Sequence, residues 1–404
     1  MRVLHLTTEF PWPPTSGGSV RTVKQLELVA SLPEVDAITT LSVAEQDVTS
    51  ERRVEFERSV PKLRVMPPVF HPVHLFDFKR YVPRVVALRA LRVPYLAGKW
   101  DSRSYRRLVR RELAQAPIDL VYLDHLGMAR YLAEIRAERP HARVVLDQHN
   151  VESDFFAQFA KRARGPKKIA GVLEHRASVR FEREALRAVD AVVAISGDDA
   201  KHFDALAGIR AHVVPVVMPF ARRPRPAPDR AHFCYVGNLR WRPNAEGLDW
   251  FCANVWPRIR ARMPGATFEI AGVGLEKGEV PRAWQVEGAL TVGFLEDLEP
   301  LYARSTAMLA PILGGSGVRM KLLEGFRAGM PVVTTPDGAF GLPLEDGREA
   351  LVSPDPDGFA DRAVRVANDA ALRERLREGG YGYLEKHHSL SAAQGAMRRV
   401  LGLA

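Results

Sequence analysis

The stretch PILGGSGVRMKLLEGFRAGMPVVTT, residues 311–335, decides the fold. An apolar strand ends in the run Gly314-Gly315-Ser316-Gly317, an amphipathic helix follows from near Ser316 to residue 328, and Gly329 ends that helix before a second strand. Two strands joined through a helix in this way lie parallel in one sheet. The stretch therefore predicts a parallel α/β sheet with a glycine-rich turn at the carboxyl end of a strand.

The same alternation of strands and helices covers the rest of the chain. Strand-like apolar runs in the first half are VLHLTT, AITTLSV, LVYLDH, RVVLDQH and AVVAIS, and those in the second half are FCYVGNL, ATFEIAGVG, LTVGFL, AMLAPIL, PVVTT and ALVSP. Helical periodicity appears over 20–31, 174–189, 245–262, 317–328 and 359–378. This order predicts two doubly wound, Rossmann-like domains, each with a parallel sheet between two layers of helices.

A chain of 404 residues is long enough for two domains, and the break between them falls in PVVMPFARRPRPAPDR, residues 215–230. This stretch holds five prolines and no periodicity, as linkers do. We expect a first domain over 1–218, a linker over 219–230 and a second domain over 231–384. A C-terminal helix over 385–404 is expected to pack back on the first domain. Folds of this kind bind ligands at the carboxyl ends of their strands, here in a cleft enclosed by the two domains.

Composition and the N-terminus predict a cytoplasmic protein. No apolar run approaches the roughly 20 residues that a membrane-spanning helix needs. The start, MRVLHLTTEF, lacks the basic flank and cleavage site of a secretory signal and is typical of a buried strand. The two cysteines, Cys234 and Cys252, are too few for a disulfide framework, and we expect both in the core.

Positive charge is concentrated in residues 51–112, which hold 16 Lys/Arg and 6 Asp/Glu. Aromatic residues are interleaved with these cations, so the segment is suited to anionic lipid head groups or an acidic acceptor. Solvated arginine-rich helix faces are the alternative interpretation. No nucleic-acid-binding motif accompanies the charge, so nucleic acid is not expected as a partner.

The glycine-rich turn is suited to a diphosphate. Its glycines allow close approach to the backbone, and the free amide groups of the first helical turn, with Arg319 and Lys321, offer positive charge without a metal. Glu324 lies further along the helix in an apolar context, where its carboxylate needs hydrogen-bond donors such as ribose hydroxyls. Alternatively, Glu324 pairs within the helix with Lys321 or Arg327.

These residues resemble the donor-site signature of family-four glycosyltransferases with the GT-B fold, and the resemblance covers nearly the whole chain. It implies that Gly17 and Gly18, in the run TSGG after the first strand, meet the donor phosphates at a helix start. It implies that His149, in LDQHNVES, contacts the donor sugar near its transferred carbon. His149, Lys321 and Glu324 are thus the expected catalytic residues.

The resemblance extends through the second domain with two departures. The stretch YVGNLRWRPNAEGL has Asn238 after Gly237 where the family has an arginine and Pro243 where it has a lysine, and Arg240 and Arg242 are possible substitutes. Of two glutamates eight positions apart, Glu324 matches the later one, whereas Ser316 stands at the earlier position. The remaining expected donor-binding residues are Phe294 and Leu295, near the nucleotide base, and Gly315, Ser316, Gly317, Val318 and Arg319 at the turn.

The family resemblance implies transfer of a sugar from a nucleotide-sugar donor to a carbohydrate or lipid-linked acceptor, with retention of configuration and without a cofactor. No metal site is expected: Asp355-Pro356-Asp357 is the one carboxylate pair with a suitable spacing, and it lies in a loop. Two other classes fit the same motifs. One is a nucleotide-sugar epimerase or phosphorylase of the same fold, and the other is a non-catalytic sugar-nucleotide-binding protein of an envelope polysaccharide pathway.

Overall fold

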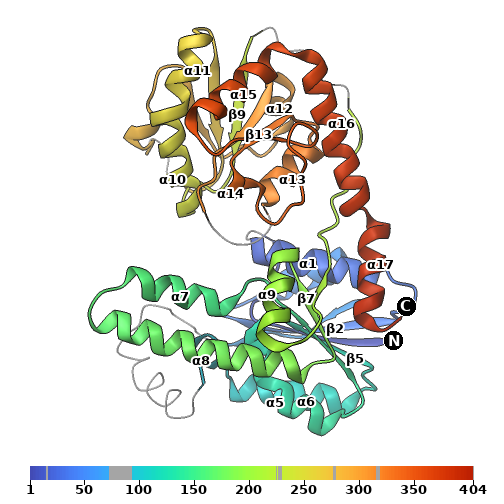
Figure 1. Ribbon diagram of the computed structural model, residues 1–404. Coiled ribbons are helices and arrows are strands. Elements are labelled where there is room, and N and C mark those ends of the chain that lie inside the picture. The colour runs from blue at the N-terminus through green and yellow to red at the C-terminus, as the bar shows by residue number, and fades with distance from the viewer. Residues whose placement is uncertain are drawn as a thin grey trace. The chain divides into compact units, whose positions relative to one another are not determined.

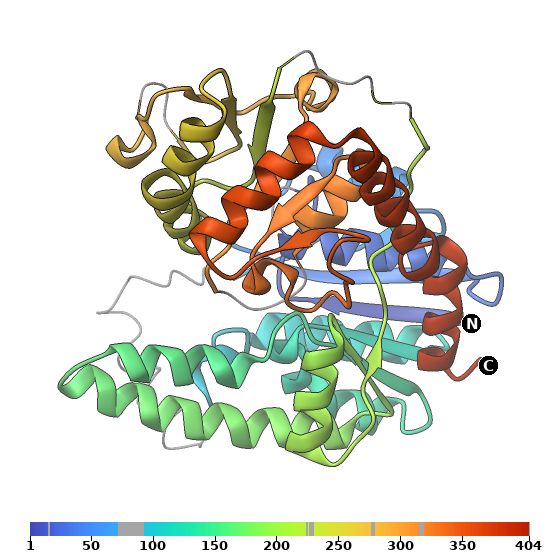
Figure 2. The ribbon, with the colours of Figure 1, turned by 45° about the horizontal axis from the view of Figure 1, so that its top comes forward.

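The computed structural model describes residues 1–14, 17–71, 93–223, 225, 230–275, 279–314 and 319–403. The chain forms two compact units, shown as ribbons in Figures 1 and 2. Unit 1 comprises Met1–Val217 and Leu390–Ala404, and unit 2 comprises Met218–Ser389. The described residues of the expected linker, 219–223, 225 and 230, are grouped with unit 2, where Arg222 pairs with Glu385 and Arg225 pairs with Glu299.

Unit 1 is built on one parallel sheet with the strand order β3-β2-β1-β5-β6-β7-β8, and β4 pairs with β2. The strands are β1 (Arg2–Thr7), β2 (Ala37–Ala44), β3 (Leu63–Val65), β4 (Val69–Phe70), β5 (Leu120–Asp124), β6 (Arg143–Asp147), β7 (Ala191–Ala194) and β8 (His212–Val213). All five predicted runs are confirmed as strands. The sequence analysis missed β3, β4 and β8, because two or three residues are too few to show a periodicity.

Helices cover both faces of this sheet, as a doubly wound fold requires. One face packs against α5 (Arg103–Gln115), α6 (Leu132–Glu138), α8 (Pro166–Ala188) and α9 (Gly197–Ala207). The other face packs against α1 (Gly17–Ala30), α2 (Ser50–Ser59) and α17 (Leu390–Leu401). The remaining helices are α4 (Tyr95–Gly98), the 3-10 helix η1 (Leu126–Tyr131) and α7 (Glu152–Arg162).

Unit 2 repeats the architecture with the strand order β11-β10-β9-β12-β13-β14, again all parallel. Its strands are β9 (His232–Val236), β10 (Thr267–Ala271), β11 (Ala289–Gly293), β12 (Ala307–Ala310), β13 (Val332–Thr334) and β14 (Leu351–Val352). Each falls on a predicted run. Its helices are α10 (Arg242–Trp250), η2 (Phe251–Val255), α11 (Trp256–Arg262), η3 (Arg282–Trp284), α12 (Glu299–Arg304), α13 (Met320–Arg327), α14 (Pro336–Ala339), α15 (Pro356–Asn368) and α16 (Ala370–His387).

Several helix limits differ from the prediction for local reasons. The expected helix over 359–378 is two helices, because Asp369 ends α15 and its side chain caps α16 by accepting from the amide of Leu372. The helix over 245–262 contains one π-helical turn, η2. The C-terminal helix does not run unbroken from 385, since the chain bends between His387 and Leu390. Helix α13 begins at Met320, later than the expected start near Ser316.

Candidate active site

In unit 1, polar side chains gather where the carboxyl ends of three neighbouring strands meet. Strand β1 lies between β2 and β5, and its last residue, Thr7, stands beside Asp124 at the end of β5, which in turn stands beside Asp147 at the end of β6. The chain continues from β1 to β2 on one side and from β5 to β6 on the other, so the ends of β1 and β5 form the topological switch point of a doubly wound fold. Ligand sites of such folds lie at this point.

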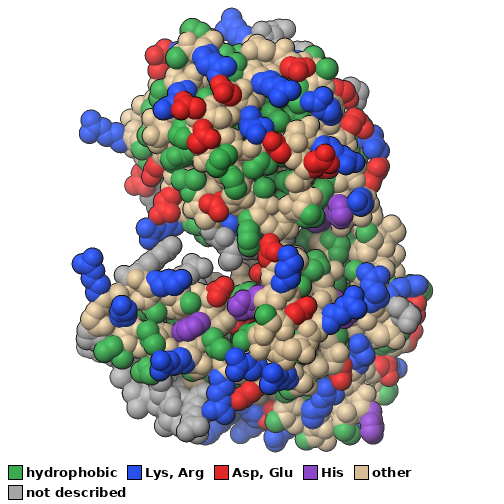
Figure 3. All heavy atoms as spheres, viewed as in Figure 1, with side chains coloured by type: hydrophobic (Ala, Val, Ile, Leu, Met, Phe, Trp, Pro, Cys, Tyr) green, Lys and Arg blue, Asp and Glu red, His purple; other side chains and the backbone are tan. Residues whose placement is uncertain are grey.

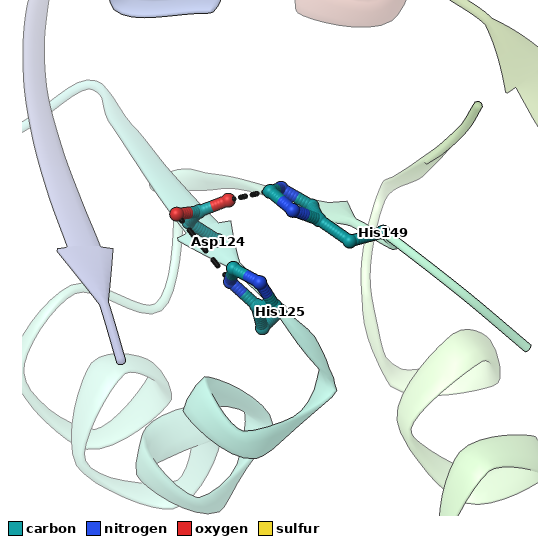
Figure 4. Close-up of side chains that lie close together, drawn as sticks. All are labelled: Asp124, His125 and His149. Carbon is teal, nitrogen blue, oxygen red and sulfur yellow. Dashed lines mark ion pairs between the residues drawn. The ribbon is translucent and has the colours of Figure 1, made fainter. Parts of the chain in front are cut away.

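Asp124 is the centre of this cluster (Figure 4). Its Oδ2 accepts hydrogen bonds from the hydroxyls of Thr7 at 2.9 Å and Thr22 at 2.7 Å. Its Oδ1 lies 2.6 Å from Nε2 of His149, and its Oδ2 lies 3.4 Å from Nδ1 of His125. The two imidazoles lie against each other, with their ring centroids 3.7 Å apart and their planes tilted by 36°. Two histidines therefore share one buried carboxylate.

This arrangement holds a single positive charge, because two imidazoles this close repel each other when both are protonated. Burial lowers the pKa of His149, and the neighbouring His125 lowers it further. Burial also lowers the pKa of His125, but the Asp124 carboxylate more than offsets this and raises the pKa to about 9. The side chain of His125 is 20% exposed and that of His149 is 4% exposed, so the proton belongs on His125. His149 is neutral and oriented by Asp124.

A second buried carboxylate, Asp147, ties the first helix to the same edge. Arg21 donates to Asp147 Oδ1 at 2.8 Å, and the hydroxyl of Tyr122 donates to Oδ2 at 2.8 Å. Arg21 and Thr22 both lie in the second turn of α1, which starts at Gly17. The predicted residues Gly17 and Gly18 thus begin a helix that is anchored at the strand end carrying His149. Thr15 and Ser16 lie outside the described residues.

The residues after His149 are fixed by a carboxylate on α8. Glu182 is fully buried and accepts hydrogen bonds from the amides of Glu152 and Ser153 in the first turn of α7, and from Gln148 Nε2. Burial raises the pKa of Glu182 to about 7 against the opposing effect of these donors. The loop that carries His149 is therefore held at the start of α7.

In unit 2 the corresponding edge is lined by glycines. Gly237 follows β9, and Gly272, with a φ of 150°, follows β10. A Cβ atom on Gly272 would lie 1.7 Å from the carbonyl oxygen of Gly237, so only glycine permits this approach of the two turns. A Cβ on Gly237 would lie 3.1 Å from Nζ of Lys321. The strand ends therefore offer backbone and a lysine cation at their surface.

Lys321 is that cation, and it reaches the strand end from the first turn of α13. Its Nζ donates to the hydroxyl of Tyr235 at 2.6 Å and to Asn244 Oδ1 at 2.8 Å, and it lies 4.1 Å from the centroid of the Tyr235 ring. Asn244 in turn donates to the carbonyl oxygen of Asn238 at 2.8 Å. Burial, aided by the nearby charge of Arg319, lowers the pKa of Lys321 to about 7. This lysine is held by neutral partners, and no carboxylate of the described residues pairs with it.

The two other charged residues predicted at the turn have protein partners. Arg319 is 4% exposed and donates to the carbonyl oxygens of Gly314 and Asp337, each at 3.1 Å. The expectation of an apolar environment for Glu324 is wrong, because its side chain is 41% exposed and pairs with Arg327 at 2.7 Å. The alternative of an internal ion pair is thus the arrangement found. Gly315, Ser316, Gly317 and Val318 lie outside the described residues.

The remaining predicted donor-binding residues lie around the same strand ends. Arg240 is exposed and donates through Nε to the carbonyl oxygen of Gly274 at 2.6 Å, whereas Arg242 pairs with Glu246 one turn along α10. Phe294 follows β11 and is 65% exposed, with Leu295 partly buried beside it in the chain. These side chains lie near the carboxyl ends of the strands of unit 2. Their roles in donor binding stay predictions.

Among the described residues, one group of ligand-type side chains lies close enough for a metal ion, namely Asp124, His125 and His149, with atoms within 4.8 Å of one another. Both oxygens of Asp124 have protein partners, whereas Nε2 of the buried His149 lies 2.6 Å from Oδ1 without the geometry of a hydrogen bond. In the carboxylate pair of the sequence analysis, Asp355 caps α15 through the amide of Gly358, and Asp357 pairs with Arg258. Cys234 and Cys252 are buried and unlinked, as predicted.

The sequence analysis missed the residues that position the predicted ones. It quoted LVYLDH and FCYVGNL as strands but did not select Asp124, His125 or Tyr235. The available signal was the one that selected His149: polar residues at the carboxyl end of a buried strand. Asn244 and Glu182 carried no such signal, since each lies within a helix and reaches the site only through the fold.

Comparison with solved structures of known proteins identifies the fold of the chain. Solved structures that cover nearly the whole chain include Anabaena Alr3699/HepE in complex with UDP (13% identity, 100% of both chains, TM-score 0.66). Others are the lipopolysaccharide outer core galactosyltransferase WaaB (14% identity, 100% of this chain and 99% of that one, TM-score 0.65) and TarM (8% identity, 99% and 98%, TM-score 0.69). The chain has the GT-B fold of these glycosyltransferases.

A match to a protein-family model lies within unit 2. Residues 230–369 match the family model described as glycosyl transferases group 1. This match contains Gly237, Asn244 and Lys321, so unit 2 is similar to the group 1 glycosyl transferases at the residues of the site described above. A protein of the cps region of Klebsiella pneumoniae, described as an uncharacterized 44.6 kDa protein, is 23% identical over 405 residues and covers 96% of each chain.

Proposed function

We propose that the protein transfers a hexosyl group from a nucleotide-sugar donor to a carbohydrate or lipid-linked acceptor, and that unit 2 binds the donor. The observation that carries this proposal is the position of Lys321. Its ammonium lies at the glycine-lined strand end, held by Tyr235 and Asn244, inside the part of the chain that matches the family model. HepE, which shares the fold, has been solved with UDP and with UDP-glucose.

The leaving nucleoside diphosphate needs charge stabilisation as its bond to the sugar breaks. Lys321 and backbone amides near Gly237 supply it in this proposal, without a metal ion. A lysine with a pKa near 7 gains a proton when a diphosphate binds, because the anion favours the charged form of the ammonium. Binding and protonation are then coupled, and no carboxylate must be displaced first.

Unit 1 contributes His149 and binds the acceptor in this proposal. Neutral His149, oriented by Asp124, is suited to accept a hydrogen bond from a sugar hydroxyl near the transferred carbon. His125 carries the compensating positive charge beside the same carboxylate. Transfer proceeds with retention, and the leaving phosphate assists deprotonation of the acceptor. These assignments extend the family resemblance.

Polysaccharide or glycolipid synthesis is the biological setting we propose. The Klebsiella pneumoniae relative is named for the cps region, and WaaB is named as a lipopolysaccharide outer core galactosyltransferase. Both names point to cell-envelope carbohydrate as the kind of acceptor. We place the reaction in the cytoplasm, with peripheral contact at the inner membrane face.

The proposal is tested with a panel of nucleotide sugars. Thermal shift first selects the donor, because a ligand that binds the folded state raises its melting temperature. Release of nucleoside diphosphate is then measured with and without added alcohol acceptors. Acceptor-dependent release supports transfer. Turnover that needs no acceptor assigns the chain to the epimerase or phosphorylase class. Donor binding with neither release of nucleoside diphosphate nor slow hydrolysis of the donor assigns it to the class of non-catalytic binding proteins.

A further inference from the structure

The hairpin of α7 and α8 has an unusual distribution of side chains. The two helices are joined by residues 163–165 and run side by side (Figures 1 and 2). Along α8 the side turned toward the protein carries polar residues: Glu174, Ser178 and Glu182 are buried there, together with Gly171. The opposite side carries Ile169 and Leu173, one helical turn apart, which are 66% and 47% exposed. The outer face of the helix therefore exposes two large aliphatic side chains.

Cations surround these apolar residues. Residues 159–176 hold six Lys/Arg and one acidic residue, Glu174, which is buried. Lys161, Arg164, Lys167 and Lys168 are exposed, and no acidic side chain within the described part of the chain pairs with any of them. In Figure 3, blue and green side chains lie together over this end of the hairpin. The sequence analysis overlooked this second basic region.

Neither feature stabilises the hairpin. Lys167 and Lys168 lie in the first turn of α8, which has no acidic residue, and cations at a helix N-terminus oppose the helix dipole. Ile169 and Leu173 gain nothing from exposure to water. A partner that accepts both cations and aliphatic side chains accounts for the two together.

We propose that this surface, defined by Lys161, Arg164, Lys167, Lys168, Ile169 and Leu173, docks the protein on an anionic phospholipid bilayer. The lysines and arginine contact phosphate head groups, and the two aliphatic side chains enter the boundary of the acyl chains. No helix of the described residues is long and apolar enough to span a bilayer, so the contact is interfacial. The inference is independent of the transfer reaction.

The basic segment chosen from the sequence is less suited to this role where it is described. Helix α5 buries its apolar residues Tyr105, Val109 and Leu113. Arg106 pairs with Asp101 and Glu134, and Arg110 also pairs with Glu134. Residues 72–92 lie outside the described residues. The exposed Arg103 and Arg107 on α5 provide a matched control surface with charge and no exposed apolar neighbour on that helix.

The test uses one reporter at each surface. Both native cysteines are buried, so Ile169→Cys and, as the control, Arg103→Cys can each be labelled with a polarity-sensitive fluorophore. Vesicles of phosphatidylcholine alone are compared with vesicles that also contain phosphatidylglycerol. We expect a blue shift only for the hairpin label and only with phosphatidylglycerol, and high salt should weaken it. Lys167→Gln with Lys168→Gln should weaken vesicle partitioning about thirtyfold, since each basic residue near an anionic surface contributes about fivefold.

Three results would overturn the proposal. They are the absence of a shift at the hairpin, a shift at the α5 label alone, and a hairpin shift without lipid. In the last case, light scattering that shows a dimer in the unaltered protein and a monomer in Ile169→Glu would assign the surface to a second copy of the chain. Loss of vesicle binding with unchanged donor affinity separates this inference from the proposed function.

Discussion

The two sheets share an architecture but differ at the edge where ligands bind. At the carboxyl ends of β1, β5 and β6, unit 1 places two buried carboxylates, two adjacent histidines and Arg21, all with protein partners. At the carboxyl ends of β9 and β10, unit 2 places glycines and one lysine held by neutral groups. The first edge is preorganised around a fixed charge, and the second is shaped to receive one.

This difference assigns separate tasks to the two edges. A network whose charges are already compensated can orient a sugar hydroxyl, but it has little to gain from a diphosphate. A bare turn with an ammonium group of lowered pKa gains from any anion that restores its charge. We therefore expect changes in unit 1 to affect the rate of transfer and changes in unit 2 to affect donor affinity.

Asp124→Asn should have the largest effect. The neutral amide of the new asparagine no longer stabilises a protonated His125. Its NH2 group also faces a side chain that donates to the carboxylate in the unaltered protein, so the orientation of His149 is lost. We expect kcat/KM for transfer to fall on the order of a hundredfold or more, as for the loss of positioned acid–base groups. Donor affinity, measured by calorimetry, should stay within about twofold. Asp190→Asn, in the same unit, is the control, and a loss of donor affinity in Asp124→Asn would break the division of tasks.

Lys321→Ala should come next. Removing the ammonium should weaken binding of the nucleoside diphosphate by about 1.5–3 kcal/mol, the range for a hydrogen bond to a charged group. Lys386→Ala, an exposed lysine of the same unit, is the control and should bind as the unaltered protein does. Equal affinities for the two variants would remove Lys321 from the donor site.

The pH dependence of unfolding should report the charge on His125. The pKa of His125 is raised from 6.5 to about 9 in the folded protein, so its stabilisation is complete below pH 6.5 and is lost as the pH rises through 9. The full effect is at most about 3 kcal/mol. We expect the melting temperatures of the unaltered protein and His125→Gln to differ most at pH 6 and to converge above pH 9. A difference that grows with pH would place the proton elsewhere.

Glu324→Gln should have the smallest effect on stability. The carboxylate is partly exposed and pairs with Arg327 within one helix, which contributes about 0.3–0.5 kcal/mol. Arg327→Gln should change the melting temperature as little. If the side chain of Glu324 turns to the donor when the donor binds, Glu324→Gln should weaken donor affinity and Arg327→Gln should not. Equal donor affinities in both variants would restrict Glu324 to the ion pair.

The sequence predicted the central strands of both sheets because their apolar runs are long and end at glycine, proline or polar residues. It missed the short edge strands and the break at Asp369, where an aspartate caps a new helix inside a continuous periodic pattern. It found His149 and Lys321 through the family resemblance. It could not find Asp124, Tyr235 and Asn244 as their partners, because those contacts join residues 25, 86 and 77 positions apart.

The most direct test is a crystal structure of the protein soaked with the nucleoside diphosphate that stabilises it most. The account predicts the diphosphate in unit 2, with an oxygen at hydrogen-bond distance, about 2.7–3.2 Å, from Nζ of Lys321 and with backbone amides near Gly237 around it. Electron density for the diphosphate at the Asp124 cluster of unit 1, with Lys321 still bound only to Tyr235 and Asn244, would contradict it.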